Sequence, residues 1–179
     1  MRIYGNRLLK TLPGQATRPT SARVREAVFN IWQGDIEGCR WLDLCAGNGS
    51  MGAEALCRGA DRVVGIEQSG RAISIIRQNW QGIIRPGQSM GVLRGDVRQK
   101  LNDLAGEQFD RIYFDPPYRS DLYEAVPCAI ARLQLLCDTG ELAIEHDPKL
   151  WKAVEIAGLE RVRHKVYGNT AIAFYQIAQ

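Results

Sequence analysis

The sequence has few residues that could hold a metal ion. It contains two histidines, His146 and His164, and five cysteines that never lie at the spacing of a CxxC pair. A zinc site would therefore have few plausible ligands, and we predict no metal. The scattered cysteines are expected to be small core residues in a reducing compartment.

The chain also lacks long apolar runs. Its longest ones are short and interrupted by charge, and the N-terminus has no apolar core of the kind found in secretory signals. No segment is therefore expected to span a bilayer, and we expect a cytoplasmic location. The length of 179 residues suits one compact domain. We predict a single domain and a monomer, in which residues 1–33 form a basic arm and helix and residues 40–179 form the core.

Acidic residues are missing from the first 25 positions of the chain. No acid precedes Glu26, although the net charge of the whole chain is only +3. The basic residues of this stretch are Arg2, Arg7, Lys10, Arg18, Arg23 and Arg25. A cationic arm suits a polyanion such as nucleic acid, because phosphates supply affinity that does not depend on sequence. A solvated terminus explains the charge equally well, so charge alone leaves both interpretations open.

Helix-like and strand-like segments alternate after this arm. Pro19-Thr20-Ser21 offers a helix start, and Val24, Val28 and Ile31 then recur at helical spacing. Further helices are predicted over Met51–Arg58, Arg71–Trp80, Val97–Leu104, Leu122–Leu136 and Leu150–Ala157. Strands are predicted over Arg40–Cys45, Arg62–Glu67, Gly91–Arg94, Phe109–Phe114 and Glu141–Glu145, followed by a closing hairpin of Arg161–Val166 and Ala171–Ile177.

This alternation predicts an α/β fold. Strands that alternate with helices form a parallel sheet covered on both faces. We therefore expect a doubly wound, mostly parallel sheet of seven strands with a C-terminal antiparallel hairpin, in a Rossmann-like arrangement. His164 shares a strand face with the apolar residues Val162 and Val166, and we therefore predict that its side chain is buried.

A glycine-rich segment lies where the first core strand turns into a helix, and it reads Asp43-Leu44-Cys45-Ala46-Gly47-Asn48-Gly49-Ser50-Met51-Gly52. Glycines there let the backbone approach a ligand, and the helix N-terminus offers free N–H groups. The three glycines also fit the dinucleotide-binding pattern, and Glu67 ends the next strand, where a ribose-binding acid belongs. A nicotinamide-dependent dehydrogenase therefore has to be considered.

Asp43 favours a different cofactor. A carboxylate just before the glycine turn is unfavourable beside a pyrophosphate, but it suits the cationic amino and sulfonium groups of S-adenosylmethionine. Glu67 would accept both ribose hydroxyls, and Asp96 is placed either to receive the adenine amine or to cap the helix that follows. With their neighbours, these residues form the predicted cofactor site: Asp43, Ala46, Gly47, Asn48, Gly49, Glu67, Gln68, Asp96 and Val97.

The tetrapeptide Asp115-Pro116-Pro117-Tyr118 follows an apolar strand, at the edge of the sheet where such folds bind ligands. The amine of a nucleobase is a poor nucleophile because its lone pair is delocalised into the ring. If the Asp115 carboxylate and the Pro116 carbonyl each accept one N–H, the lone pair can turn toward a methyl donor. The prolines would hold both acceptors in place, and Tyr118 would stack on an extruded base. Taken alone, the tetrapeptide could also be a plain rigid Pro-Pro turn. The tetrapeptide does not show whether the amine belongs to adenine, cytosine or guanine.

Over nearly its whole length the sequence resembles the RsmD-type methyltransferases, which modify the guanine N2 amine of small-subunit (16S) ribosomal RNA. The most specific match is Arg18-Pro19-Thr20-Ser21-Ala22-Arg23-Val24-Arg25-Glu26-Ala27-Val28-Phe29-Asn30-Ile31. Further matches are Gly52-Ala53-Glu54-Ala55-Leu56-Cys57-Arg58-Gly59-Ala60, Phe114-Asp115-Pro116-Pro117-Tyr118, Glu145-His146 and Tyr167-Gly168-Asn169-Thr170.

The resemblance implies the class I methyltransferase variant of the Rossmann-like fold. It implies that Asp115 to Tyr118 hold a guanine and that the substrate is an assembled or assembling small ribosomal subunit. Independently of the resemblance, we expect RNA phosphates to be bound by Arg18, Arg23 and Arg25. These arginines flank or begin the first helix, whose apolar face must be buried, so they are expected on its outer side.

Two other functions compete with this interpretation. A DNA adenine-N6 methyltransferase would share the glycine loop and the tetrapeptide, but this chain has no room for a separate recognition domain. A non-catalytic nucleic-acid-binding module would explain the basic arm, but it would leave the intact tetrapeptide unexplained.

Overall fold

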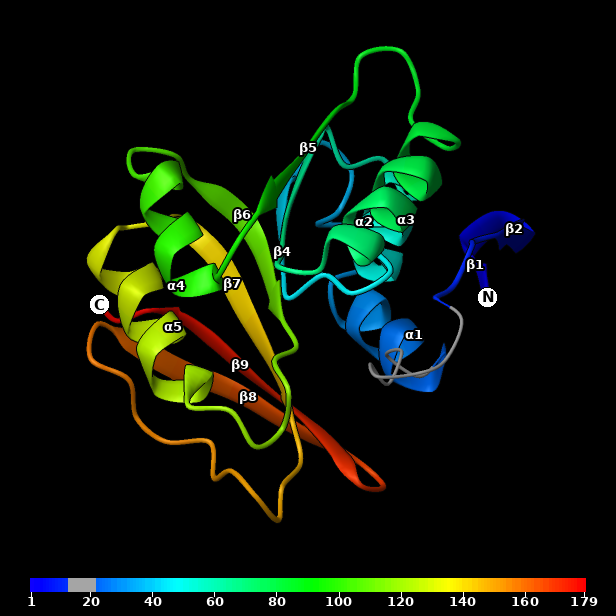
Figure 1. The fold of residues 1–179 in the computed structure, drawn as a ribbon. Coiled ribbons are helices and arrows are strands. Elements are labelled where there is room, and N and C mark those ends of the chain that lie inside the picture. Colours follow the sequence, from blue (N-terminus) through cyan, green and yellow to red (C-terminus); the bar gives the residue numbers. More distant parts are fainter. Residues whose placement is uncertain (13–21) are drawn as a thin grey trace.

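The computed structural model describes residues 1–12 and 22–179. Arg18 and the Pro19-Thr20-Ser21 helix start lie outside the described residues. Within them, the predicted α/β architecture is confirmed by a seven-stranded sheet with the strand order β5-β4-β3-β6-β7-β9-β8 (Figure 1).

Five parallel strands form the main part of this sheet, in which β3, β4 and β5 on one side and β6 and β7 on the other follow the doubly wound order. Their bounds are Arg40–Leu44 (β3), Arg62–Glu67 (β4), Ser89–Arg94 (β5), Phe109–Phe114 (β6) and Leu136–His146 (β7). The chain ends in an antiparallel hairpin whose strands are Leu159–Tyr167 (β8) and Thr170–Ile177 (β9), with β9 inserted beside β7. Because parallel strands end at the same edge, the loops after β3, β4, β6 and β7 can meet there.

Helices cover both faces of the sheet, and each face has its own apolar core (Figure 1). On one face lie α1 (Ala22–Ile31), α2 (Ser50–Cys57) and α3 (Gly70–Gln81). On the other lie α4 (Val97–Lys100), the short 3-10 helix η2 (Leu101–Leu104) and α5 (Leu122–Arg132). The first core is built around Trp32, Trp41 and Trp80, all fully buried. The second contains the buried Leu101 and Ile130 among its helical members.

A small hairpin lies at the N-terminus. It consists of β1 (Arg2–Ile3), the 3-10 turn η1 (Tyr4–Asn6) and β2 (Arg7–Leu8), and it lies against α2. Asn79 on α3 holds the chain just after it, because its side chain accepts the N–H of Lys10 at 2.9 Å and donates to the Lys10 carbonyl at 3.1 Å.

Two helix predictions were wrong. The predicted helix Leu150–Ala157 does not form, because the carbonyl of Val154 accepts from the Tyr175 hydroxyl at 2.8 Å and Ile156 forms a β-bridge with Leu159. The helix predicted to reach Leu136 ends at Arg132, and Leu136 instead pairs with Phe109 as the first residue of β7.

His164 is exposed, contrary to the prediction of burial, as are Val162 and Val166. Strand β8 is the edge strand of the sheet, and among the described residues no helix covers one of its faces. Throughout residues 1–12 and 22–179, no helix is long and apolar enough to cross a membrane.

Candidate active site

A cavity of about 530 Å³ lies at the carboxyl ends of the parallel strands. Eight of the nine predicted cofactor residues line it, and so do all four residues of the tetrapeptide. The structure therefore brings the glycine loop after β3, the acids after β4 and β5 and the tetrapeptide after β6 to one place. Other lining residues come from the N-terminal segment, the sheet and α5: Thr11, Leu12, Cys45, Tyr113, Leu122 and Glu145.

Gly49 is the predicted cofactor residue that does not line the cavity. It has a positive φ of 72°, and its carbonyl accepts the indole N–H of Trp80 at 2.7 Å. A Cβ on Gly49 would lie 2.8 Å from that indole nitrogen, and one on Gly52 would lie 2.4 Å from the same ring. These two glycines let α2 pack against Trp80, so part of the glycine pattern serves packing and not ligand contact.

Asp43, on β3, is buried beneath the glycine loop. Its Oδ2 accepts the backbone N–H of Gly52 at 3.0 Å, within the first turn of α2. Burial raises the pKa of Asp43 from 3.8 to about 8, the nearby Glu67 carboxylate adds to this increase, and the Gly52 hydrogen bond opposes it. A cation placed beside this carboxyl would stabilise its ionised form.

Glu67, the last residue of β4, is held in place by backbone donors. Its Oε2 accepts the N–H of Gly47 and its Oε1 accepts the N–H of Ser69, both at 2.9 Å. Each oxygen keeps further lone-pair capacity. Glu67 is therefore held in a fixed orientation at the cavity and can accept further hydrogen bonds.

Asp96 caps α4, because its Oδ1 accepts the backbone N–H of Arg98 at 2.9 Å. Its Oδ2 also pairs with the Arg98 guanidinium at 2.8 Å. These contacts with Arg98 lower the pKa of Asp96. The capping alternative is thus confirmed, and Asp96 still borders the cavity as a negatively charged acceptor.

The tetrapeptide leaves β6 directly into the cavity. Asp115 is half-buried, Pro116 is buried and Tyr118 is half-buried. The Tyr118 hydroxyl donates to Oε1 of Glu145 at 3.1 Å and lies 3.2 Å from the Thr170 hydroxyl. Burial is the main cause that raises the pKa of Tyr118, so its phenol stays protonated as a hydrogen-bond donor.

Glu145 is a site residue to which the sequence analysis assigned no role. It is 4% exposed, it lines the cavity, and it accepts hydrogen bonds from the hydroxyls of Tyr113 and Tyr118. Strand register explains its position, because Phe114 pairs with Ile144, so that Glu145 on β7 lies beside Asp115, the first residue after β6. The available signal was an acid at the end of an apolar strand that follows the tetrapeptide.

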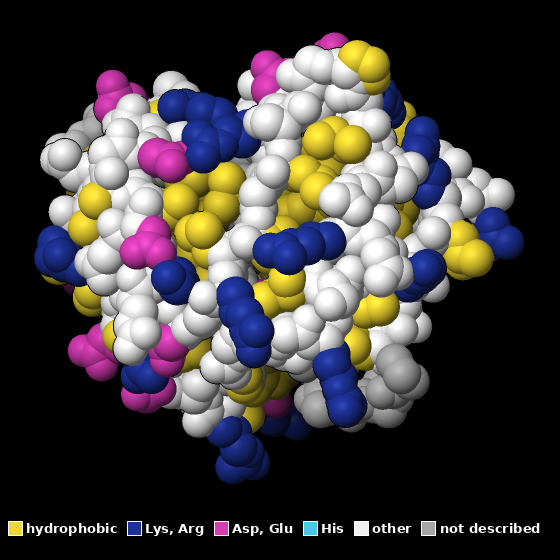
Figure 2. All heavy atoms as spheres, turned by 45° about the horizontal axis from the view of Figure 1, so that its top comes forward, with side chains coloured by type: hydrophobic (Ala, Val, Ile, Leu, Met, Phe, Trp, Pro, Cys, Tyr) yellow, Lys and Arg dark blue, Asp and Glu magenta, His cyan; other side chains and the backbone are white. Residues whose placement is uncertain are grey.

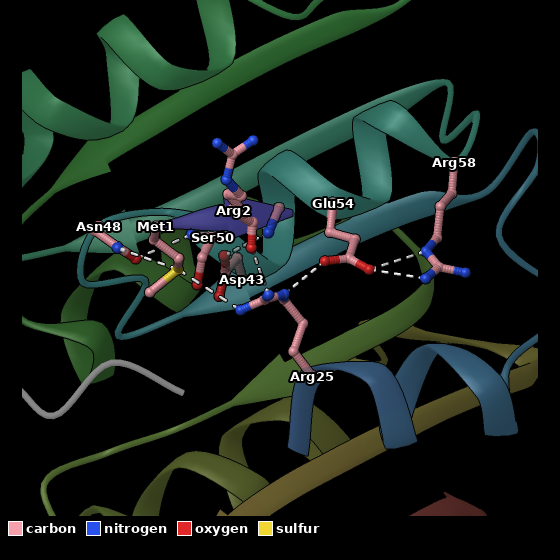
Figure 3. A network of polar contacts seen from close by, with 9 residues as sticks. Met1, Arg2, Arg25, Asp43, Asn48, Ser50, Glu54 and Arg58 are labelled. Carbon is pink, nitrogen blue, oxygen red and sulfur yellow. Dashed lines mark hydrogen bonds and ion pairs between the residues drawn. The ribbon is translucent and has the colours of Figure 1, made fainter. Parts of the chain in front are cut away.

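Of the three predicted RNA-binding arginines, Arg23 and Arg25 are among the described residues, and their positions differ. Arg23 is exposed, and it acts electrostatically on Tyr167 near the β8–β9 turn. Arg25 is 3% exposed and not on the outer side of the helix as predicted. Its Nε pairs with Glu54 at 2.6 Å and its Nη2 donates to the Arg2 carbonyl at 2.8 Å (Figure 3). The predicted outward position of Arg25 was wrong, because Arg25 falls on the helix face that covers α2 and β1.

Comparison with known proteins identifies the family. The sequence model described as "Conserved hypothetical protein 95" matches residues 1–176. YlbH of Bacillus subtilis is 32% identical over 172 residues, which cover 95% of this chain and 93% of that protein. The Escherichia coli "Ribosomal RNA small subunit methyltransferase D" is 33% identical over 194 aligned positions, covering 98% of this chain and 89% of that protein.

A solved structure extends this likeness to three dimensions. The structure of the Escherichia coli protein yhhF has a TM-score of 0.84 at 28% identity, and the match covers 99% of this chain and 97% of that one. Sequence and fold thus agree over almost the whole length. The chain belongs to this family, the RsmD-type methyltransferases.

Proposed function

We propose that this protein transfers a methyl group from S-adenosylmethionine to the exocyclic N2 amine of a guanine in small-subunit (16S) ribosomal RNA. The observation that carries the proposal is the single cavity shared by the tetrapeptide and the predicted cofactor acceptors. One set of residues would hold the methyl donor and the other would hold the amine, so that the reacting atoms meet between them.

The residues present fit S-adenosylmethionine better than a dinucleotide. Asp43 lies buried at the glycine loop, where a cation is favourable and a pyrophosphate is not. Glu67 is oriented to accept two ribose hydroxyls, and Asp96 and Val97 border the space for the adenine. When bound, this cofactor supplies a methyl carbon attached to a positively charged sulfur.

The chain's own residues prepare the amine. Asp115 and the Pro116 carbonyl accept its two N–H groups, which favours a tetrahedral nitrogen whose lone pair is no longer delocalised. Pro116 and Pro117 keep these acceptors rigid, and Tyr118 stacks on the base. The new N–C bond forms as the C–S bond breaks, and one amine proton then leaves to solvent.

The names of several relatives refer to small-subunit ribosomal RNA, and we propose the small ribosomal subunit or its assembly intermediate as the substrate. We propose that the protein acts there as a single-domain monomer in the cytoplasm. Figure 2 shows Lys and Arg side chains spread over one face of the molecule, with apolar side chains between them. Such a surface suits RNA, because phosphates need positive charge and unpaired bases need apolar contacts.

A labelled-methyl assay tests the proposal. Purified protein and labelled S-adenosylmethionine are offered three substrates: small subunits that lack the modification, a naked 16S transcript and DNA. We expect label in guanine of the small subunit, and digestion to nucleosides identifies the methylated base. Label in DNA adenine would support the competing DNA enzyme.

Calorimetry separates an enzyme from a simple binding module. The protein is titrated with S-adenosylmethionine and, in parallel, with NAD. We expect binding of the methyl donor and no binding of NAD. A protein that binds RNA but binds neither S-adenosylmethionine nor NAD, and that labels no substrate, would contradict the proposal and favour a non-catalytic module.

A further inference from the structure

Glu145 is a buried carboxylate in the active-site cavity that the reaction described above does not use. Burying such a group is costly unless it is hydrogen-bonded. Here two phenols supply hydrogen bonds, Tyr113 to Oε2 and Tyr118 to Oε1. Because an ionised carboxylate has about four lone-pair sites, these bonds leave it able to accept from a ligand as well.

Strand register sets Glu145 beside Asp115. The pairs Tyr113–Ala143 and Phe114–Ile144 bring the two acids to matching positions just past the paired ends of β6 and β7. Neighbouring strands lie about 4.8 Å apart, and matching positions point to the same face of the sheet. The cavity therefore presents two neighbouring carboxyl groups where the substrate base would enter.

The bases differ in what flanks their exocyclic amine. In guanine the amine is followed on the Watson–Crick edge by a ring N1–H, which is a donor. In adenine and cytosine the corresponding ring nitrogen is an acceptor. A carboxylate can pair with the first arrangement but faces a lone pair in the second.

We infer that Glu145 selects guanine, by accepting the N1–H of the base whose amine is held by Asp115. This inference rests on the proposed function and names the residue that determines its base specificity. A site built around such a hydrogen bond discriminates strongly, because the wrong base leaves a buried polar group unpaired.

The residue that would stack on the base, Tyr118, also orients the residue that would select it, Glu145. The Tyr118 ring provides the stacking face, and its hydroxyl fixes Glu145. Thr170, at the start of β9, holds the same hydroxyl, and Tyr113 fixes the other carboxylate oxygen. A base stacked on Tyr118 thus has its edge directed at a carboxylate whose rotation is restricted from two sides.

Nucleotide binding measured by NMR provides the test. The protein is saturated with S-adenosylhomocysteine, so that the cofactor site is filled, and titrated with guanosine 5′-monophosphate, inosine 5′-monophosphate and 2-aminopurine riboside 5′-monophosphate. Inosine keeps the N1–H but lacks the amine, whereas 2-aminopurine keeps the amine but has no N1–H. We expect guanosine to bind roughly 10- to 100-fold more tightly than 2-aminopurine, the range for a hydrogen bond to a charged group.

Glu145→Gln should reduce this preference to within about threefold, because an amide can donate to the ring nitrogen of 2-aminopurine as well as accept from guanine. Inosine should lose affinity in the variant together with guanosine. Glu141→Gln is the matched control, since Glu141 is also buried on β7 but binds Trp32 and Gln176 away from the cavity. It should leave the preference unchanged.

Equal binding of guanosine and 2-aminopurine by the wild type, or no measurable binding of guanosine, would overturn the inference. So would a folded Glu145→Gln protein that keeps the full preference. The wild-type comparison needs no variant, so it decides even if Glu145→Gln fails to fold. If the protein methylates guanine in the small subunit but shows no preference among the nucleotides, the proposed function stands and only the role of Glu145 is rejected. Label in adenine would reject the proposed function itself.

Discussion

The two sides of the active-site cavity are built in different ways. On the cofactor side, the carboxylates of Asp43, Glu67 and Asp96 are each oriented by a backbone N–H of a nearby loop or helix start. Asp43 accepts from Gly52, nine residues away, and Glu67 accepts from Gly47, 20 residues away. On the base side, Tyr118 is held by Glu145 and Thr170, which lie 27 and 52 residues further along the chain.

This difference teaches which part of the site depends on the whole fold. The cofactor side needs only the ends of β3, β4 and β5 and the turns and short helices that follow them. The base side needs β6, β7 and the β8–β9 hairpin in the correct register, because side chains from all three strand ends form one network. Variants on the base side should therefore change catalysis without disturbing cofactor binding, and variants on the cofactor side should do the reverse.

Asp115→Ala gives the largest expected effect and tests this independence directly. Turnover should fall roughly 10²- to 10³-fold, as when one preorganised polar contact is removed from a catalytic site. The affinity for S-adenosylmethionine should stay almost unchanged, because Asp115 is assigned to the amine. Single-turnover methyl transfer and calorimetry provide the two measurements. Near-normal turnover would mean that the tetrapeptide is only a turn.

Glu67→Ala should have the opposite profile and a smaller effect. Loss of hydrogen bonds to a charged group costs on the order of 1.5–3 kcal/mol of cofactor affinity. At saturating S-adenosylmethionine, turnover should recover toward that of the wild type. A loss of turnover that saturation does not restore would contradict the separation of the two sides.

The same contrast explains what could be predicted from the sequence. Strands β4 and β6 have the predicted bounds, and the acids predicted for the cofactor site line the cavity, because local turns and strand ends place them there. Glu145 received no role, since its meeting with Tyr118 depends on strand register and not on spacing along the chain. The burial of Arg25 was missed for a similar reason, because Glu54 is its partner only after α1 docks on α2.

Asp43 links the cofactor side to pH. Its pKa of about 8 means that the free protein holds this carboxyl protonated below that pH. A cationic cofactor favours the ionised form, so binding releases the proton, and affinity should rise with pH and level off above about 8. Relative to Asp43→Asn, the wild type should gain up to about tenfold in affinity per pH unit between roughly pH 6 and 8. Calorimetry in two buffers of different ionisation enthalpy measures the released proton directly.

The raised pKa of Asp43 affects stability in the opposite direction, because stability should fall with rising pH while cofactor affinity rises. The unfolded chain ionises Asp43 near pH 3.8 and the folded chain near pH 8, so the folded state holds more protons between these values. The contribution of Asp43 to the free energy of unfolding should therefore decrease as pH rises through this range. Denaturant titrations of the wild type and Asp43→Asn should converge at low pH and diverge toward pH 8. Parallel curves would show that Asp43 is already ionised in the free protein.

The basic arm should contribute the smallest effect and should act on neither side of the cavity. Arg23 is exposed on α1, Arg18 precedes it in sequence, and Arg25 is excluded because it pairs with Glu54 in the interior. Replacing Arg18 and Arg23 by Gln should weaken binding to the small subunit and flatten its salt dependence, by somewhat under about 1 unit of log–log slope per lost phosphate contact. The methylated base and the affinity for S-adenosylmethionine should not change. Arg77→Gln with Arg132→Gln removes the same charge from exposed positions on α3 and α5, and this control should keep the wild-type slope. If both double variants lower the slope equally, the arm acts only through net charge, because a phosphate contact made by Arg18 or Arg23 would be lost from the first variant alone.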